Sequence, residues 1–517
     1  MTKIEDGVFG KCYSLTSVTI PNSVKVIDRD AFYDCRNLTS ITIPSSVTSI
    51  EYSAFENCEK LQKVISKIVK PFEIDESVFD DNRNYQNTYS RATLYVPKGT
   101  VAKYKATESW KKPKHVWLRK THIVNITMML KSEAISHGLL GEEYTDFAEK
   151  MREILDRYNG TAFEGFTGDE VLSGIDPTRG TELCSVVEQM YSYEHLFAQT
   201  GDNKWAERLE VIGFNALPAT LTEDMWAHQY VQMVNQIACE RTMIMAPFST
   251  NGPKAHTFGL QPNFGCCTAN FNQGWPKFTL SAFMHRDNTV ISPVMIPCVL
   301  KDSGITVSLE TDYPFRNRAR YTIDSEKDFT FIIRIPSFAR NLKVNGESAE
   351  TKDIETEIVP GHSEITVEFD APAHLKERPN GLYALQAGSL LFSLPIKYEK
   401  KMREYTRLGV ERKFPYCDYQ FIPKSPWNYG FCDDSFEIQY NDTGKYPFSA
   451  ANPPVTVKAK MQKINWGLKF PYRTVCRKTP KSRKPLSGPE EAELCPYGCA
   501  KLRMTEMPLI GGNDRQK

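Results

Sequence analysis

The chain has 517 residues, and its 64 Lys and Arg against 63 Asp and Glu leave a formal net charge of +1. No global field therefore favours a nucleic acid or an anionic membrane as partner. A length of this size predicts three or four domains at roughly 150 residues each, and 41% hydrophobic with 25% charged residues excludes bulk disorder, collagen and coiled coil.

The thirteen cysteines are an odd number, which argues against a fully paired disulfide framework. The most apolar run, Val290 to Leu300, is too short to cross a bilayer and contains two prolines, so no membrane insertion is expected. The first six residues carry charges where a signal peptide would be apolar, so we expect either that the protein stays in the cytoplasm or that the chain does not begin at its natural start.

The first hundred residues contain a repeat with a period of 23 residues, marked by Phe, Cys and Leu at equivalent places. Cys12, Cys35 and Cys58 occupy one apolar position of the repeat, so we interpret them as buried packing residues. The period fits a leucine-rich solenoid. Together with the closing segment Ala92 to Thr100, the stretch resembles the BspA-like leucine-rich repeats of bacterial surface proteins, which implies a binding or spacer domain over 1–112.

After the repeats the hydrophobic periodicity becomes helical, and it predicts helices near 122–135, 143–158, 182–200 and 204–219. Two segments there could carry chemistry, 168–184 and 263–277. Glu182 and Cys184 in the first, with Cys266 and Cys267 in the second, make a complete tetrahedral ligand set for Zn²⁺. Spacing alone leaves buried free cysteines as the alternative, because neither pair has the gap of a zinc ribbon.

The sequence from 118 to 508 resembles the β-L-arabinofuranosidases of glycoside hydrolase family 127. The motifs that carry this resemblance, in chain order, are Gly180-Thr-Glu-Leu-Cys-Ser-Val-Val-Glu-Gln-Met190, Asn215-Ala-Leu-Pro218, Asp224-Met-Trp-Ala-His-Gln-Tyr230, Asn235-Gln236, Asn263-Phe-Gly-Cys-Cys267 and Pro496-Tyr-Gly-Cys-Ala-Lys-Leu-Arg503. The family implies a retaining hydrolase of plant-derived L-arabinofuranosides with a zinc-bound cysteine nucleophile.

By motif position, the resemblance makes Cys266 the nucleophile, with Glu182, Cys184 and Cys267 completing the zinc shell. Metal coordination makes a thiolate plausible at neutral pH. Glu170, twelve residues before Glu182, takes the role of acid and base. Without the resemblance, we would interpret Glu170 as a solvent-exposed acidic residue on a loop.

The resemblance also suggests residues that contact the substrate. His122 matches a substrate-contacting histidine, and Tyr230 matches a tyrosine beside the nucleophilic sulfur. His228 and Gln229 share this neighbourhood and are predicted to line the pocket. The alternatives are a helix-surface residue for His122 and a core aromatic for Tyr230.

Alternating strand patterns dominate beyond residue 287, and Asn345-Gly346 is a typical hairpin dipeptide. The predicted fold is therefore multidomain α plus β. A short leucine-rich solenoid at 1–112 precedes half of an (α/α)6 barrel at 113–286, which is followed by a β-sandwich at 287–398 and a C-terminal β-rich domain at 399–517.

The repeats stand where the family has the first helices of its barrel, so a partner chain or oligomer would be needed to complete it. Two functions follow. The first is a zinc-dependent arabinofuranosidase; the second is a catalytically inactive truncated fusion that binds through its repeats and β-domains.

Overall fold

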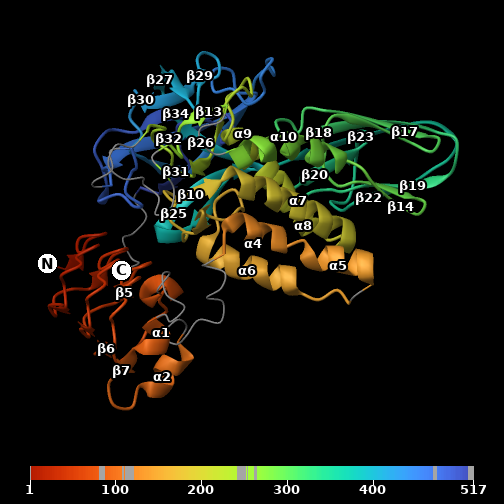
Figure 1. Ribbon diagram of the computed structural model, residues 1–517. Coiled ribbons are helices and arrows are strands. Elements are labelled where there is room, and N and C mark those ends of the chain that lie inside the picture. Colours follow the sequence, from red (N-terminus) through yellow and green to blue (C-terminus); the bar gives the residue numbers. More distant parts are fainter. Residues whose placement is uncertain are drawn as a thin grey trace. The chain divides into compact units, whose positions relative to one another are not determined.

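The computed structural model describes residues 2–80, 88–107, 110, 121–141, 143–241, 252, 254–260, 265–469 and 474–510. The chain divides into two compact units, Met1–Thr121 and His122–Lys517 (Figure 1). The four domain boundaries expected from the sequence stay predictions.

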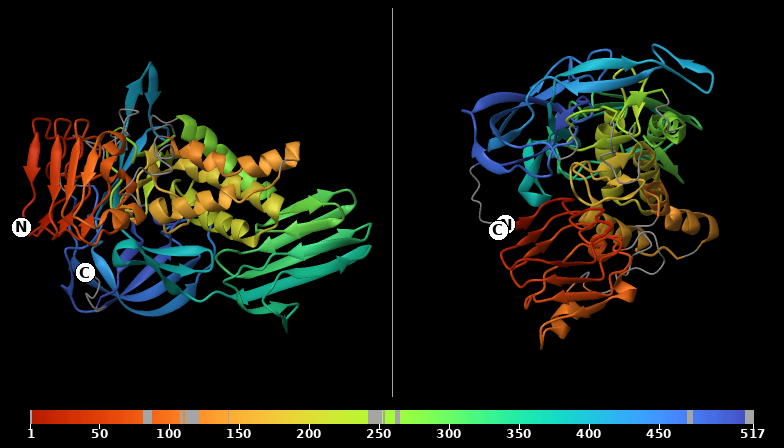
Figure 2. Two further views of the ribbon diagram at one scale, coloured as in Figure 1. Left: turned by 90° about the horizontal axis from the view of Figure 1, so that it is seen from below. Right: turned by 60° about the vertical axis from the view of Figure 1, so that its left-hand side comes forward.

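The first unit is built from short parallel strands in two sheets, ordered β1-β3-β5 and β2-β4-β6-β7, which Figure 2 shows side by side. Val18 pairs with Ile41 and Ile41 pairs with Val64, so the 23-residue period of the sequence is the register of the sheet. The elements are β1 Lys3–Ile4, β2 Ser17–Thr19, β3 Val26–Ile27, β4 Ser40–Ile43, β5 Ser49–Ile50, β6 Lys63–Ser66, η1 Glu76–Phe79, α1 Thr88–Arg91, β7 Thr93–Tyr95 and α2 Val101–Ala106.

A row of stacked aromatic rings forms the centre of the first unit. Successive ring centroids lie 5.1, 5.1 and 5.4 Å apart along Phe9, Phe32, Phe55 and Phe79. Cys35 and Cys58 are buried in the same core, and each thiol donates to a backbone carbonyl of the neighbouring repeat. These two cysteines are therefore packing residues, as their position in the repeat predicts.

The second unit begins with helices grouped around α7, which packs against α4, α8 and α10. Helix α7 ends at Gly201 in the left-handed conformation, and Asp202 then caps α8 by accepting from the Lys204 N–H. The helices are α4 Ile123–Met129, α5 Ser132–Leu140, α6 Phe147–Asn159, α7 Leu183–Thr200, α8 Asn203–Val211, α9 Leu217–Ala219 and α10 Gly265–Leu280.

Two of the predicted helices are interrupted in the structure. The helix expected at 122–135 is divided into α4 and α5 by a turn at Leu130 and Lys131. The helix expected at 204–219 contains a π-helical turn, η2 Ile212–Ala216, before α9. Pro218 explains this wider turn, because it has no N–H to donate to the carbonyl four residues earlier.

Two small sheets lie at the start of α7 and connect the helices to the β structure. One has the order β12-β10-β8-β9 and the other β11-β13-β30-β27. Their strands are β8 Gly168–Asp169, β9 Val171–Leu172, β10 Gly180–Glu182, β11 His228–Gln229, β12 Val231–Met233, β13 Phe258–Gly259, β27 Tyr398–Arg403 and β30 Asp418–Pro423. Glu182, His228 and Gln229 lie on these strands, Glu170 lies between β8 and β9, and Tyr230 lies between β11 and β12.

The rest of the second unit is β structure, including a six-stranded sheet β16-β17-β18-β23-β20-β21 and a nine-stranded sheet that contains β24 to β26. Asn345 and Gly346 have φ of 51° and 81° between β20 and β21, so the predicted hairpin is confirmed. The bounds are β14 Met284–Arg286, β15 Thr289–Ser292, β16 Cys298–Asp302, β17 Ile305–Thr311, β18 Arg318–Ser325, β19 Phe329–Ile333, β20 Arg340–Val344, β21 Glu347–Ser348, β22 Ile354–Ile358, β23 Gly361–Asp370, β24 His374–Arg378, η3 Pro379–Gly381, β25 Leu382–Ala387, β26 Leu390–Pro395, β28 Tyr405–Arg407, β29 Val410–Arg412, β31 Tyr429–Tyr440, β32 Val455–Asn465, β33 Ser482–Pro485, β34 Glu490–Pro496, β35 Arg503–Met504 and β36 Glu506–Pro508.

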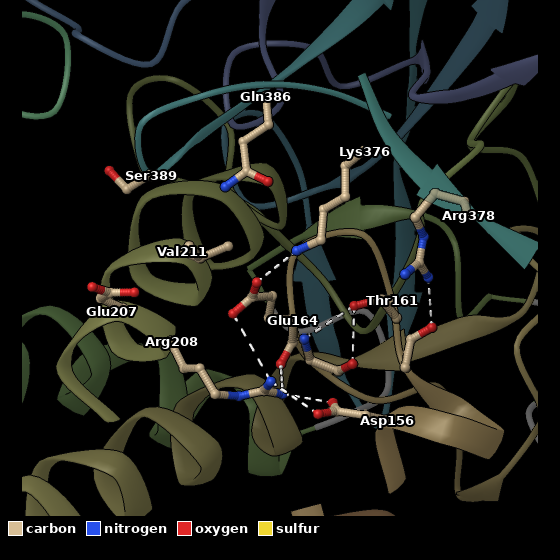
Figure 3. A network of polar contacts seen from close by, with 12 residues as sticks. Asp156, Thr161, Glu164, Glu207, Arg208, Val211, Lys376, Arg378, Gln386 and Ser389 are labelled. Atoms are coloured by element: carbon tan, nitrogen blue, oxygen red, sulfur yellow. Dashed lines mark hydrogen bonds and ion pairs between the residues drawn. The ribbon is translucent and has the colours of Figure 1, made fainter. Parts of the chain in front are cut away.

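A network of charged side chains joins the helices to β24 (Figure 3). Arg208 of α8 donates to the Asp156 carboxylate of α6 at 2.7 Å and to the backbone carbonyl of Glu164 at 2.7 Å. Lys376 of β24 donates to the Glu164 carboxylate at 2.7 Å. Because Arg208 and Glu164 are largely buried, these contacts fix helices α6 and α8 to strand β24.

Among the described residues, no helix combines the length and the apolar character that crossing a membrane requires.

Candidate active site

Three cysteines and one glutamate converge where α7 and α10 begin. Glu182 ends β10 and precedes α7, Cys184 lies in the first turn of α7, and Cys266 and Cys267 lie in the first turn of α10. The four ligand atoms all lie within 4.8 Å of one another. The two segments that the sequence analysis selects are thus brought together by the packing of α7 against α10.

The three thiols are not equivalent. Cys184 and Cys267 are buried and Cys266 is exposed. Hydrogen bonds from Cys184 and Cys267 lower the pKa of the Cys266 thiol well below its ordinary value. The hydrogen bond with Cys266 raises the pKa of Cys184, and burial raises that of Cys267. The start of a helix also favours negative charge, so the accessible sulfur is the one best able to be a thiolate.

A second group of side chains adjoins the thiols and consists of His122, Glu170 and Glu182. His122 Nε2 lies 2.9 Å from Glu170 Oε2 and 3.3 Å from Glu182 Oε2. The Tyr230 hydroxyl donates to Glu170 Oε1 at 2.5 Å. Glu182 belongs to both groups, so the thiols and the His122–Glu170 pair form one continuous site.

Local backbone structure positions Glu170. It lies between β8 and β9 with a φ of 89°, a conformation that residues with a Cβ rarely adopt. The Ile123 N–H donates to the Glu170 carbonyl at 2.7 Å, which ties this turn to the start of α4. The preceding Asp169 is buried and paired with Arg179 at 3.1 Å. The turn is therefore held on both sides, and the Glu170 side chain is directed to His122.

The protonation of these groups follows from their contacts. Hydrogen bonds with Glu170 and Glu182 raise the pKa of His122 to about 10, and the bond from His122 lowers the pKa of Glu170. Burial raises the pKa of Glu182. At neutral pH the proton of the His122–Glu170 pair therefore resides on the imidazole.

The structure places His228 and Gln229 on opposite sides of β11. His228 Nε2 lies 2.9 Å from Thr268 Oγ1, next to Cys267, and burial lowers the pKa of the imidazole. Gln229 is buried and donates to the carbonyl of His256 at 2.9 Å. The alternation of side chains along a strand explains the difference: His228 and Tyr230 face the thiol site, and Gln229 is directed into the interior.

Thr268 is a residue of this site that the sequence analysis does not identify. Its hydroxyl donates to the Leu260 carbonyl at 3.1 Å and also contacts His228. A threonine inside a helix carries no signal of function in a single sequence, because such hydroxyls commonly bond to nearby carbonyls. In the sequence, only the position of Thr268 directly after Cys267 indicates that it belongs to the site.

The donor set is of a kind that could hold a metal ion. Three sulfurs and one carboxylate oxygen, converging from two helix starts, match the number and type of ligands at a tetrahedral site for a soft or borderline cation. Cys184, Cys267 and Glu182 are buried, so little water competes for these positions. The residues therefore fit the group that the sequence predicts.

Family models match three parts of the chain. Residues 2–101 match the BspA type leucine-rich repeat region in six copies. Residues 158–280 match the catalytic domain of the GH127 β-L-arabinofuranosidases, and residues 294–367 match the GH127 middle domain. The chain resembles the GH127 β-L-arabinofuranosidases. The predicted resemblance is confirmed for both the repeats and the GH127 hydrolases.

Solved structures agree with the GH127 match. A GH127 β-L-arabinofuranosidase from Geobacillus stearothermophilus T6 superposes with a TM-score of 0.53 at 16% identity, over 80% of this chain and 64% of that one. A second structure, described as a glycoside hydrolase, gives a TM-score of 0.52 at 14% identity, over 78% of this chain and 68% of that one. These superpositions show a shared fold. No curated protein matches the chain.

Proposed function

We propose that the second unit is a retaining β-L-arabinofuranosidase that acts on plant-derived L-arabinofuranosides. One observation carries the proposal: an exposed thiol of lowered pKa, Cys266, and a hydrogen-bonded glutamate, Glu170, meet in one site through Glu182. The GH127 matches over 158–280 and 294–367 support the reaction type. We infer that helices α4 to α10 correspond to part of an (α/α)6 barrel.

The first step is a displacement at the anomeric carbon. The Cys266 sulfur forms a bond to this carbon as the bond to the leaving oxygen breaks, and Glu170 gives that oxygen a proton. Glu170 must hold a proton when substrate arrives, and the 2.9 Å hydrogen bond from His122 is a route by which it gains one. Tyr230, bonded to the other Glu170 oxygen, keeps the carboxyl in place.

The second step releases the sugar. A water molecule attacks the anomeric carbon, Glu170 accepts the water proton, and the carbon–sulfur bond breaks to regenerate the thiolate of Cys266. Two displacements at one carbon retain its configuration. The sulfur replaces the carboxylate that most glycosidases use as nucleophile.

Zn²⁺ is the proposed metal, and Glu182, Cys184, Cys266 and Cys267 are the residues that would hold it. When bound, zinc would supply positive charge that keeps the thiols deprotonated and makes the sugar–sulfur bond easier to break. His122 and Tyr230 are proposed to contact the substrate and to orient the Glu170 carboxyl toward it. His228 is proposed to line the site beside Thr268. Gln229 is buried, so we propose a structural role for it.

The proposal is tested by zinc content and hydrolysis of an aryl β-L-arabinofuranoside, with the chain compared with Cys266→Ser and Glu170→Gln. About one zinc per chain, with turnover that both substitutions abolish, is the expected result. Zinc without turnover in the unsubstituted chain would contradict the enzymatic proposal. The catalytically inactive fusion that binds through its repeats would then be the better account.

The chain spans 64% of the length of the Geobacillus stearothermophilus T6 structure. Its activity, substrate and partners are for this reason proposals. Completion of the helical part by a second polypeptide or by oligomerisation stays a prediction, and size measurement in solution checks it.

A further inference from the structure

A second set of metal-binding side chains adjoins the three thiols. His122, Glu170 and Glu182 each offer one ligand atom, and these atoms all lie within 4.8 Å of one another. His122 directly precedes α4, Glu170 lies in the turn between β8 and β9, and Glu182 ends β10. An imidazole and two carboxylates therefore converge from three segments of the chain.

One oxygen of each carboxylate faces the imidazole. The Tyr230 hydroxyl donates to Oε1 of Glu170, and Oε2 of Glu170 lies 2.9 Å from His122 Nε2. Glu182 Oε2 lies 3.3 Å from the same nitrogen, and the described residues give this buried oxygen no well-directed hydrogen bond. A buried carboxylate oxygen in this state is costly. A cation bound between the two oxygens would remove that cost.

Glu182 belongs to both sets of ligands. A carboxylate has two oxygens, and two-metal sites in enzymes hold their ions about 3.5–4 Å apart. Glu182 can therefore serve one ion held with the three thiols and a second ion held with His122 and Glu170. The second position needs no ligand that the first position uses up.

The charge around the second position is negative. Thiols that bind a metal are deprotonated, so three thiolates and two carboxylates surround the two positions. One dication among the thiols leaves this negative charge in excess, even when His122 holds a proton. A second dication beside a neutral His122 also leaves the whole set negative. The ligands thus compensate the repulsion between two ions.

The second position is open to solvent on one side. The side chains of His122 and Glu170 are 36% and 34% exposed, and that of Glu182 is 1% exposed. An ion can therefore enter past the first two residues and meet Glu182 at the base of the site. The imidazole selects the class of ion, because Zn²⁺ and other divalent transition-metal ions accept nitrogen ligands, whereas Mg²⁺ and Ca²⁺ prefer oxygen alone.

We propose that His122, Glu170 and Glu182 hold a second divalent transition-metal ion, which binds more weakly than the ion at the thiols and inhibits hydrolysis. Two oxygens and one nitrogen attract such an ion less than three thiolates do. The bound ion occupies the Glu170 carboxyl, which then neither gives nor accepts a proton. The inhibition rests on the proposed function, because it assumes that Glu170 acts on the substrate. The ion site rests on the geometry of the three side chains.

Zinc binding tests the site without turnover. Titration of the metal-free chain with Zn²⁺ should show two ions, one tight and one weaker. In His122→Ala and in Glu170→Ala the weaker ion should bind at least about a hundredfold less well, with the tight ion retained and the melting temperature unchanged. His362→Ala is the matched control, because His362 also contacts two carboxylates, Asp324 and Glu364, but through opposite ring nitrogens and on an exposed strand. One ion in the unsubstituted chain at excess zinc, or two ions in His122→Ala, would overturn the inference.

Inhibition separates this inference from the proposed function. Hydrolysis of an aryl β-L-arabinofuranoside should fall to half at the free zinc concentration that half fills the second site, and Mg²⁺ at the same concentration should not inhibit. Turnover that persists with the second site filled would overturn the inference, and inhibition by Mg²⁺ would overturn the class of ion. If the chain hydrolyses nothing while His122→Ala loses the weaker ion, the site stands and the proposed function falls.

Discussion

His122 Nε2 lies 2.9 Å from Glu170 Oε2, and the same nitrogen lies 3.3 Å from Glu182 Oε2. One imidazole therefore contacts both the proposed acid/base and a proposed metal ligand. The pKa of His122 is raised to about 10 by these bonds, while that of Glu170 is lowered, so the pair is ionic at neutral pH. The protonation of the site depends on this contact.

Replacement of His122 by Gln should move the pH profile of kcat/KM. Glu170 would lose the cation that lowers its pKa, so the limb that Glu170 contributes should move to higher pH by about one to three units. His362→Gln, an exposed histidine paired with Asp324 on the β structure, is the matched control and should leave the profile unchanged. Coincident profiles for His122→Gln and the unsubstituted chain would contradict this role.

Removal of the Tyr230 hydroxyl should reduce activity without unfolding the chain. Tyr230→Phe keeps the buried ring but loses the 2.5 Å bond to Glu170, and a bond to a charged group is worth about 1.5–3 kcal/mol. We expect kcat to fall about tenfold to a hundredfold at an unchanged melting temperature. Tyr321→Phe loses a comparable buried bond to Ser292 far along the chain, and its kcat should not change. Equal effects of the two variants would exclude a specific role for Tyr230.

Most elements with a strong local signal are predictable from the sequence. The 23-residue period sets the strand register of the first unit, and the hairpin at Asn345 and Gly346 forms where expected. The interruption of the helix near Pro218 is a case where periodicity alone fails. The apolar spacing continues through the proline, although its missing N–H changes the hydrogen-bond pattern.

The candidate site was predictable in its residue types but only in part in its contacts. Motif resemblance selects Cys266 and Glu170, and packing of α7 on α10 brings the thiols together. The contacts of His122 with Glu170 and Glu182 join residues far apart in the chain and depend on the left-handed turn at Glu170. Gln229 stays a prediction as a pocket residue, and its burial and its hydrogen bond to the His256 carbonyl follow from strand alternation once β11 is known.

Glu194 should make stability depend on pH. Burial raises its pKa to about 7, so the folded state holds a proton that the unfolded chain releases near pH 4.5. Stability should therefore fall as the pH rises from about 4.5 to 7 and stay low above that range. Glu194→Gln removes this loss. The difference in unfolding free energy between the two chains should change by about 3 kcal/mol between pH 4.5 and 8 in urea titrations. A constant difference would contradict the raised pKa.

The network of Figure 3 should contribute to the stability of the second unit. Arg208→Met removes a largely buried guanidinium from this network, while Asp156 keeps Arg152 and Glu164 keeps Lys376. We expect a cost of about 1.5–3 kcal/mol, the worth of hydrogen bonds to charged groups. Arg318→Met is the matched control, since the Arg318–Asp312 pair is exposed and should cost less than about 1 kcal/mol. Urea unfolding of both variants measures the two costs. Similar losses would show that the network adds no more than a surface pair.

The central claim is that the Cys266 sulfur bonds to the sugar. In Glu170→Gln, an aryl β-L-arabinofuranoside with a good leaving group should still react with Cys266, but release should be slow because no base activates water. Peptide mass mapping of the zinc-loaded variant after incubation with this substrate should therefore find one pentosyl group on the peptide that contains Cys266. A pentosyl group on another residue, or an unmodified Cys266 while aryl alcohol is released, would contradict the account.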